Sequence, residues 1–400
     1  MKFKRIKSNH VQGILEPENS RKYPFQRLPQ KYKNKVRQEV WDLSENSAGV
    51  SMSFFTNTST LVAKWKLKNK FKMHHMTDVA ISGLDLYQKR NKCWYFTGAA
   101  IPGDLENEVC LFSGFKKKFV KVSKGKIFCR FKGVGPPLLL LHGYPQTHVM
   151  WHKTAPELSK YFTTIVADLR GYGDSFVLPG GTKHKNYSKR EMAKDMIQLM
   201  GEFNFRKFFV AGHDRGGRVA HRMARDFRDR ILALSVLDIC PTLDMYEHTD
   251  MKFAKGYFHW FYLIQPTPLP EKMIMKDPKG WLQSRFNRSS KRAIRAVEKE
   301  YLRSFQKKER IHASCEDYRA AASIDLEHDK KDRNKKLNIP IQVLWGKKGI
   351  VGKQFNSKKI WQKYTNKNVY GSEINSDHFI PEESPKETIN HLKNFFLKYA

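Results

Sequence analysis

The sequence predicts an α/β fold in which helices cover a parallel sheet, with a helical insertion and a smaller β domain in front. Three observations carry this prediction. After residue 116, short apolar runs bounded by Gly, Asp or His alternate with segments of helical periodicity. Between residues 242 and 332 the alternation stops, and the chain becomes helical and rich in aromatic residues. Before residue 116, short alternating stretches indicate exposed strands instead.

The apolar runs of the larger part are continuous, which is typical of strands covered on both faces of a parallel sheet. These predicted strands are Pro137–Leu141, Phe162–Ala167, Lys207–Ala211, Ile231–Leu237 and Pro340–Trp345. Apolar residues at helical spacing predict helices over Lys189–Phe203 and Gly217–Phe227.

The aromatic-rich insertion lies between two of these strands. One helical face is predicted to carry Ile294, Val297, Tyr301, Leu302 and Phe305. An insertion placed directly after a strand is interpreted as a cap over the edge of the sheet where catalytic loops gather. The predicted boundaries are 116–241 and 333–400 for the sheet domain and 242–332 for the cap.

The front of the chain divides into two parts. Residues 1–37 carry 11 Lys and Arg against two Glu, with three prolines and no sustained periodicity, and are predicted as a basic flexible tail. Residues 38–115 are predicted as an accessory β-sandwich. Its clearest predicted strands are Val50–Phe54, Thr60–Trp65 and Cys93–Gly98.

The net charge of the 400-residue chain is +35, from 74 Lys and Arg against 39 Asp and Glu. This excess is spread along the chain, so it favours attraction of small anions over a specific nucleic-acid partner. The five cysteines form no C-x-x-C pair, which argues against a zinc site and for a reducing compartment. No apolar stretch reaches the length of a membrane span. We therefore expect a cytoplasmic protein that uses no metal or organic cofactor and binds no membrane.

A nucleophile elbow is indicated by Val210-Ala-Gly-His-Asp-Arg-Gly-Gly217, which follows a predicted strand and precedes a helix. This is the arrangement of the α/β-hydrolases, with Asp214 at the position of the nucleophile. The glycines allow the tight turn. A Ser or Cys here would favour acyl transfer, whereas a carboxylate attacks an sp³ carbon and forms an ester. In isolation, an Asp between glycines is more often a simple turn.

An ester on Asp214 requires a base that activates water, and His378 follows the last predicted strands. An ordinary pKa near 6.5 would leave its imidazole neutral at pH 7. Asp238 directly follows the predicted strand Ile231–Leu237 and is expected to orient that imidazole. Asp377 is the alternative acid, although adjacent residues rarely face each other. The predicted triad is therefore Asp214, Asp238 and His378.

An oxyanion hole is predicted from the backbone N–H groups of Tyr144 and Arg215. Tyr144 lies in the turn His142-Gly-Tyr-Pro145, which follows the first long apolar strand. A purely structural turn is the alternative. Gly173-Asp-Ser175 resembles a serine-hydrolase motif in letters only, and we reject a serine mechanism.

Together these motifs resemble the fluoroacetate (haloacetate) dehalogenases, a branch of the α/β-hydrolases, over about residues 116–400. The segments that are similar to the sequence motifs of this family are His142–His152, Gly212–Arg218, Val236–Thr242, Tyr257–Trp260, Cys315–Ala320 and the Pro-Glu-Glu after His378. The resemblance implies that Asp214 attacks the carbon that bears the halogen and that Arg215 and Arg218 hold the substrate carboxylate. It implies a halide pocket made of His259, Trp260 and Tyr318, for which ordinary aromatic packing is the alternative. A homodimer is implied only by the resemblance.

The sequence departs from that family at two points. Asp377 stands where the family usually has Gly, and its charge could raise the pKa of the adjacent His378. A tryptophan expected in the middle of the cap is not matched, because Trp281 lies at a different offset. At the front, Gly83-Leu-Asp-Leu-Tyr87 resembles the small β domain that precedes some SGNH-type esterases. No SGNH catalytic domain follows it here, and we assign it no function.

The sequence thus predicts a haloacetate dehalogenase, which converts short 2-haloacids and water to glycolate and halide. An epoxide hydrolase is the alternative, with the same Asp nucleophile and with Tyr318 and either Tyr257 or Tyr262 as acids. The arginine pair favours the dehalogenase, because an epoxide carries no carboxylate. A binding protein, in which the front of the chain recognises polyanions and the hydrolase part is inactive, is a further alternative that the intact triad disfavours.

Overall fold

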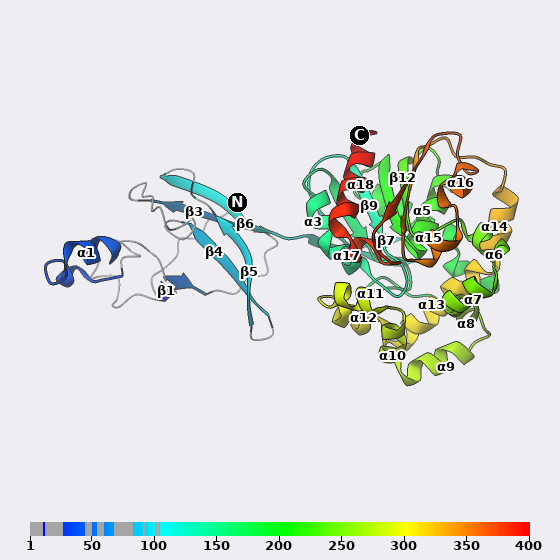
Figure 1. Ribbon diagram of the computed structural model, residues 1–400, viewed down its shortest axis with the longest axis horizontal. Helices are drawn as coiled ribbons and strands as arrows, with labels where there is room; N and C mark the ends of the chain where they lie inside the picture. The colour runs from blue at the N-terminus through cyan, green and yellow to red at the C-terminus, as the bar shows by residue number, and fades with distance from the viewer. Residues whose placement is uncertain are drawn as a thin grey trace. The chain divides into compact units, whose positions relative to one another are not determined.

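The computed structural model describes residues 11–12, 27–44, 50–53, 60–67, 83–90, 93–100, 102 and 105–400. It divides the chain into two compact units, residues 1–115 and residues 116–400 (Figure 1). In the part of the chain so described, no helix is long and apolar enough to cross a membrane.

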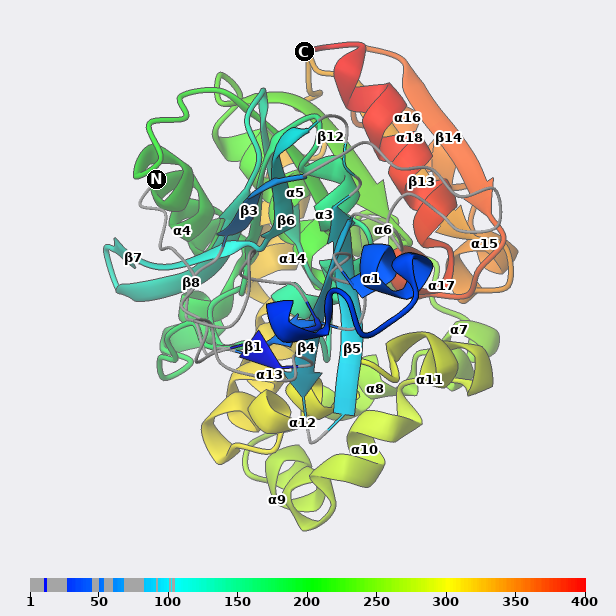
Figure 2. The same cartoon turned by 90° about the vertical axis from the view of Figure 1, so that its left-hand side faces the viewer.

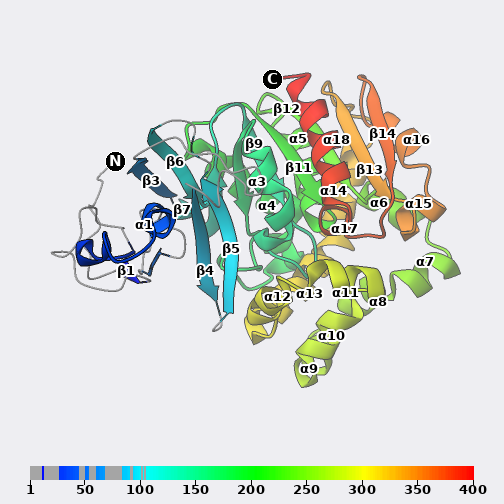
Figure 3. The ribbon, with the colours of Figure 1, turned by 60° about the vertical axis from the view of Figure 1, so that its left-hand side comes forward.

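The larger unit is built on an eight-stranded sheet with the strand order β14-β13-β12-β11-β9-β10-β8-β7 (Figure 3). Six neighbouring strands are parallel: β9 (Pro137–Leu141), β10 (Thr163–Ala167), β11 (Phe208–His213), β12 (Ile231–Leu237), β13 (Ile341–Gly346) and β14 (Val369–Ile374). The hairpin of β7 (Lys116–Val122) and β8 (Gly125–Lys132) joins β10 in antiparallel orientation. The sheet is therefore mixed: its parallel part agrees with the prediction, and the β7–β8 hairpin adds an antiparallel edge.

The predicted strands of the sheet all form, because their apolar side chains are buried in the sheet. The side chains of Leu138–Leu141 and Phe208–Ala211 are wholly buried. Among the covering helices, α4 (Lys189–Gly201) packs against α5 (Arg215–Asp226), and α18 (Pro385–Leu397) packs against α3 (Ala155–Leu158). Helix α5 begins two residues before the predicted Gly217, because the chain becomes helical directly after Asp214.

All regular secondary structure between β12 and β13 is helical, and this insertion, predicted as a cap, is called the cap below. Its helices are α6 (Thr242–Glu247), α7 (Met251–Gly256), α8 (Phe258–Leu263), α9 (Leu269–Lys276), α10 (Pro278–Ser284), α11 (Arg288–Ile294), α12 (Glu298–Phe305), α13 (Lys308–Ala321) and α14 (Ile324–Asp332). The helices α8 to α13 lie together at one end of the strands, whereas α14 lies beside the sheet (Figures 1 and 3). The single helical face predicted for this segment is divided, because Ile294 ends α11 and Val297 precedes α12.

After β13 the chain forms three short helices before α18: α15 (Ile350–Gln354), α16 (Ser357–Gln362) and α17 (Ile380–Glu383). Two 3-10 helices, η4 (His148–Lys153) and η5 (Thr182–Tyr187), follow β9 and β10. The chain that leads from β14 into α17 contains His378.

The smaller unit pairs its described strands two by two in antiparallel orientation. β3 (Thr60–Lys66) pairs with β6 (Glu106–Ser113), and β4 (Leu84–Arg90) pairs with β5 (Cys93–Ala100) (Figure 2). The short strands β1 (Val11–Gln12) and β2 (Ser51–Met52) also pair. The segment predicted as a tail thus contributes a strand and the 3-10 helix η3 (Gln30–Tyr32), and helix α1 (Gln38–Ser44) opens the predicted β region. Residues 1–10, 13–26 and Phe54 lie outside the described residues.

Candidate active site

Asp214 occupies a tight turn between β11 and α5. Its backbone has a φ of 43° and a ψ of −112°, a conformation that costs a non-glycine residue free energy. A Cβ at Gly212 would lie 2.4 Å from the carbonyl oxygen of Gly216, and one at Gly216 would lie 2.5 Å from that of His142. Both glycines of the predicted elbow are therefore required by close backbone contact.

The carboxylate of Asp214 meets the turn after β9. The backbone N–H of Tyr144 donates to Asp214 Oδ2 at 3.0 Å. The turn approaches so closely that a Cβ at Gly143 would lie 2.7 Å from the Cβ of Asp214. Arg215 is the first residue of α5, and the first N–H groups of a helix have no partner within it. The two predicted backbone donors thus flank Asp214.

The imidazole of His378 is bound to Asp238, which follows β12. The distance between His378 Nδ1 and Asp238 Oδ2 is 2.6 Å, and Gly346 N–H donates to the other oxygen at 2.9 Å. The carboxylate of Asp377 instead accepts the backbone N–H of His378 at 2.9 Å and the amide of Asn287 at 2.5 Å. Of the two candidate acids, Asp238 is therefore the one that contacts the ring.

The electrostatics of the site couple Asp214 and His378. Burial by itself would raise the pKa of Asp214, but the positive charges of His378, Arg215 and Arg218 outweigh it and lower that pKa to about 2. Burial would lower the pKa of His378, but the hydrogen bond and charge of Asp238, with the charges of Asp214 and Asp377, raise it to about 9. The pKa of His378 thus lies above the ordinary value near 6.5, and the charge of Asp377 acts in the direction expected from the sequence.

Arg215 is wholly buried and is held by a cap residue that the sequence motifs do not single out. Its Nε and Nη2 donate to the two carboxylate oxygens of Asp317 at 2.9 and 2.8 Å, and Nη2 also donates to the Asp317 carbonyl at 2.8 Å. Asp317 also contacts Lys189, which is in turn paired with Asp325 at 3.3 Å. Among the described residues, Nη1 of Arg215 is buried without a partner.

Arg218 lies one turn further along α5 and is bound differently. Its Nη1 donates to the carbonyl of Cys240 at 3.2 Å and to Thr242 Oγ1 at 2.9 Å, and its Nη2 contacts the sulfur of Met245 at 3.3 Å. Its Nε has no partner in the described part of the chain. No described carboxylate forms a salt bridge with Arg218. Each of the two arginines near Asp214 therefore keeps one buried N–H group that an anion could accept.

The three residues predicted for a halide pocket come together beside these arginines. The ring centroid of Tyr318 lies 5.8 Å from that of His259 and 6.3 Å from that of Trp260. The guanidinium carbon of Arg215 lies 4.2 Å from the Tyr318 ring, and that of Arg218 lies 4.6 Å from the Trp260 ring. Tyr318 OH and His259 Nδ1 are buried with no partner among the described residues, which is unusual unless a ligand satisfies them.

Trp281 lies next to the turn His142–Pro145. No role was predicted for it from the sequence, because it is not at the position where the family has its tryptophan. Its Nε1 donates to the hydroxyl of Tyr144 at 2.7 Å and so joins the cap to that turn. Of the other tyrosines, Tyr257 has its ring 6.1 Å from His378, whereas Tyr262 lies against Trp281 at 5.2 Å. Nothing in the sequence predicted the contact between Trp281 and Tyr144.

A second contact between cap and core is made by Glu382, four residues after His378. Its carboxylate accepts from Gln146 Nε2 at 2.6 Å and from the hydroxyl of Tyr301 at 2.8 Å. Burial raises the pKa of Glu382 to about 8. Gln146 Oε1 is buried and has no partner among the described residues.

The family model for the α/β-hydrolase fold matches residues 136–385, and the chain belongs to this family. Within it, the chain is 39% identical to a fluoroacetate dehalogenase of a Burkholderia species, over 71% of this chain and 95% of the relative. It is 32% identical to a soluble epoxide hydrolase of a Corynebacterium species, over 66% of this chain and 91% of that protein. The predicted resemblance to the fluoroacetate dehalogenases is thereby confirmed.

The fold is also that of a solved structure described as an α/β hydrolase from Nostoc sp PCC 7120. The TM-score is 0.69 and the identity 46%, over 70% of this chain and 98% of that structure. The front of the chain matches a second family model, the GxDLY N-terminus of SGNH-hydrolase-type esterases, over residues 1–122. This confirms the resemblance that Gly83–Tyr87 indicates.

Proposed function

We propose that the chain is a hydrolytic dehalogenase of short 2-haloacids, with haloacetate as the simplest substrate. The observation that supports this most is the pair of buried guanidiniums beside Asp214, each with one N–H group that has no partner among the described residues. Two such donors suit a carboxylate, because charge-assisted hydrogen bonds are strong in a buried site. Holding the carboxylate there would bring the substrate α-carbon to the nucleophile.

In the first step, an Asp214 oxygen attacks the α-carbon, and the electrons of the carbon–halogen bond leave with the halide. The low pKa of Asp214 keeps it ionised across the neutral range. The leaving halide receives hydrogen bonds from Tyr318, Trp260 and His259, whose charge stabilisation matters most in the transition state. Burial lowers the pKa of His259 well below its usual value, so the ring acts as a neutral donor.

In the second step, His378 takes a proton from water, and the hydroxide attacks the carboxyl carbon of the Asp214 ester. The backbone N–H groups of Tyr144 and Arg215 hold the oxyanion. The alkoxide leaves with the proton from His378 as glycolate, and Asp214 then ionises again. Esterification removes the negative charge of Asp214, which is one of the charges that raise the pKa of His378. The ester itself therefore makes His378 a more available base.

The test measures halide release from fluoroacetate and chloroacetate by the wild type, Asp214→Asn and His378→Gln. We expect release by the wild type at pH 9 and a loss of about a thousandfold or more in Asp214→Asn. His378→Gln should form the ester without hydrolysing it, so its intact mass should rise by one carboxymethyl group. An unmodified His378→Gln together with an inactive wild type would refute the proposal. Release of chloride alone would keep the nucleophile but remove the fluoride role of the halide pocket.

Epoxide hydrolysis is the second candidate, and one observation favours it. Tyr318 OH is buried without a partner among the described residues, and Tyr257 lies against His378, so phenols are available to protonate an epoxide oxygen. Hydrolysis of styrene oxide without any halide release would select this function. An Arg218→Gln variant separates the two, because it should weaken haloacetate turnover and spare a neutral epoxide.

A further inference from the structure

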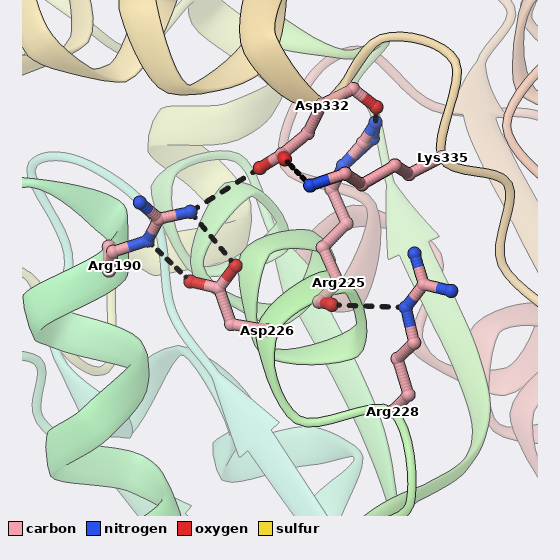
Figure 4. Close-up of a pocket in the computed structure, with 6 residues that line it drawn as sticks. All are labelled: Arg190, Arg225, Asp226, Arg228, Asp332 and Lys335. Carbon is pink, nitrogen blue, oxygen red and sulfur yellow. Dashed lines mark hydrogen bonds and ion pairs between the residues drawn. The ribbon is translucent and has the colours of Figure 1, made fainter.

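A pocket rich in arginine lies away from Asp214, where α4, α5 and α14 meet. It has a volume of about 460 Å³ and is lined by Arg190, Arg225, Asp226, Arg228, Asp332 and Lys335 (Figure 4). Arg225 and Asp226 end α5, whereas Asp214 precedes its first residue. A helix of 12 residues is about 18 Å long, so this pocket is distinct from the candidate active site.

The two carboxylates of this pocket are already saturated. Asp226 accepts Arg190 Nε and Nη2 at 2.7 and 3.1 Å, and Arg222 Nη1 lies 3.2 Å from its Oδ1. Asp332 accepts from Arg222 at 2.7 Å and from Lys335 at 2.9 Å, and Arg190 lies 3.3 Å away. Both carboxylates are therefore already bound by Arg190 and Arg222, and Asp332 is bound by Lys335 as well.

Two arginines of the lining keep donors that these carboxylates do not reach. Arg225 is only 6% exposed, and its Nε and Nη1 have no partner among the described residues. Its Nη2 donates to the carbonyl of Asp332 at 2.7 Å. Arg228 donates from Nε to the Arg225 carbonyl at 3.4 Å, and in Figure 4 no dashed line reaches its terminal nitrogens. Burial and the neighbouring charge of Arg222 lower the pKa of Arg225, and the charges of Asp329 and Asp332 oppose this shift without cancelling it.

We propose that this pocket binds the phosphate group of a small phosphate monoester through Arg225 and Arg228. The four basic and two acidic residues of the lining leave two positive charges, which a phosphate dianion would neutralise. Guanidinium N–H groups match phosphate oxygens in geometry and in charge. The volume exceeds what a bare phosphate needs and lies in the usual range of small-molecule sites, which leaves room for an organic part. This inference does not depend on the proposed dehalogenase activity.

The test is calorimetric titration of the full chain with glycerol 3-phosphate and with inorganic phosphate, at an ionic strength fixed with sodium chloride. Arg228→Gln is the main variant, because Arg228 is exposed and its replacement should leave the fold intact. Lys358→Gln is the matched control, because it removes one positive charge from a different surface pocket. Urea unfolding of both variants checks that the fold is unaffected.

We expect one site for glycerol 3-phosphate, with a dissociation constant that rises about tenfold or more in Arg228→Gln and stays unchanged in Lys358→Gln. Inorganic phosphate should bind the same site, more weakly, because it lacks the organic part. Equal binding by wild type and Arg228→Gln would overturn the proposal. So would an equal loss in Lys358→Gln, which would indicate general charge, or displacement by glycolate, which would indicate the candidate active site.

Discussion

Replacing Asp317 by Asn tests whether the carboxylate of Asp317 fixes the orientation of the Arg215 guanidinium. Asp317 gives Arg215 three hydrogen-bond contacts of 2.8–2.9 Å and is wholly buried with it. Asn keeps the shape and the backbone contact but loses the charge and one acceptor. We expect the guanidinium of Arg215 to lose its fixed orientation, so that its Nη1 no longer meets the substrate carboxylate reliably.

The size of the stability loss follows from the buried charges. Lys189 and Arg215 are balanced by Asp317 and Asp325, so the Asn variant leaves one buried positive charge without compensation. Removing one partner of a buried pair typically costs about 3–5 kcal/mol. A domain is usually stable by about 5–15 kcal/mol, so the variant should fold but unfold at a clearly lower urea concentration.

The assay pairs urea unfolding with the kinetics of haloacetate turnover, and Asp325→Asn is the matched control. Asp325 belongs to the same charge network and is paired with Lys189 at 3.3 Å, but it makes no hydrogen bond to Arg215. Both variants should lose stability. Only Asp317→Asn should raise KM, by about tenfold for the loss of one charge-assisted hydrogen bond, with a smaller change in kcat.

A KM of Asp317→Asn equal to that of the wild type would refute this reasoning. In that case Arg215 would be held by the surrounding packing, with its ring contact to Tyr318 as the main support. A rise of KM in both variants would point to the charge of the network and not to the orientation of one guanidinium.

Two further predictions concern pH. Because the charge of Asp377 helps to raise the pKa of His378, Asp377→Asn should move the acidic limb of the kcat–pH profile about half a unit lower, and an unmoved limb would contradict this. Glu382 has a folded pKa of about 8 against an ordinary value near 4.3, so its contribution to stability is full below pH 4 and is lost as the pH rises through 8. Glu382→Gln should therefore unfold like the wild type at pH 5 and be more stable than the wild type by roughly 1–3 kcal/mol at pH 9. The Gln146 amide would flip and accept a hydrogen bond from the new Gln side chain. Equal stability of the two proteins at pH 9 would contradict the raised pKa of Glu382.

The sheet was predictable where burial made the sequence uniform. The predicted strands Pro137–Leu141 and Ile231–Leu237 coincide with β9 and β12. Both faces of these strands are covered, so nearly all of their residues are apolar and buried. The hairpin of β7 and β8 was not predicted as strands, because Lys116–Val122 opens with three consecutive lysines and is partly exposed. Buried parallel strands can thus be predicted from continuous apolar runs in the sequence, whereas a partly exposed antiparallel edge strand lacks such a run.

The candidate site was predictable where a residue directly follows a strand. Asp214 and Asp238 both do so, and they meet the other site residues at the same edge of the sheet. Asp317 and Trp281 lie within the cap, and their partners Arg215 and Tyr144 are 102 and 137 residues away. No periodicity connects positions that far apart, so only the folded cap brings these pairs together.

The contact between Asp238 and His378 spans 140 residues, and the whole cap lies between them. During synthesis, the nucleophile elbow, β12 and every cap helix leave the ribosome before the strands β13 and β14 that carry the chain to His378. A nascent chain therefore carries Asp214 and Asp238 before His378 is made, so the candidate triad can be completed only after the whole cap has been synthesised. A stop codon before His378 would also remove α17 and α18, whose Phe395 and Phe396 are buried, so it would take away the candidate base and part of the core together.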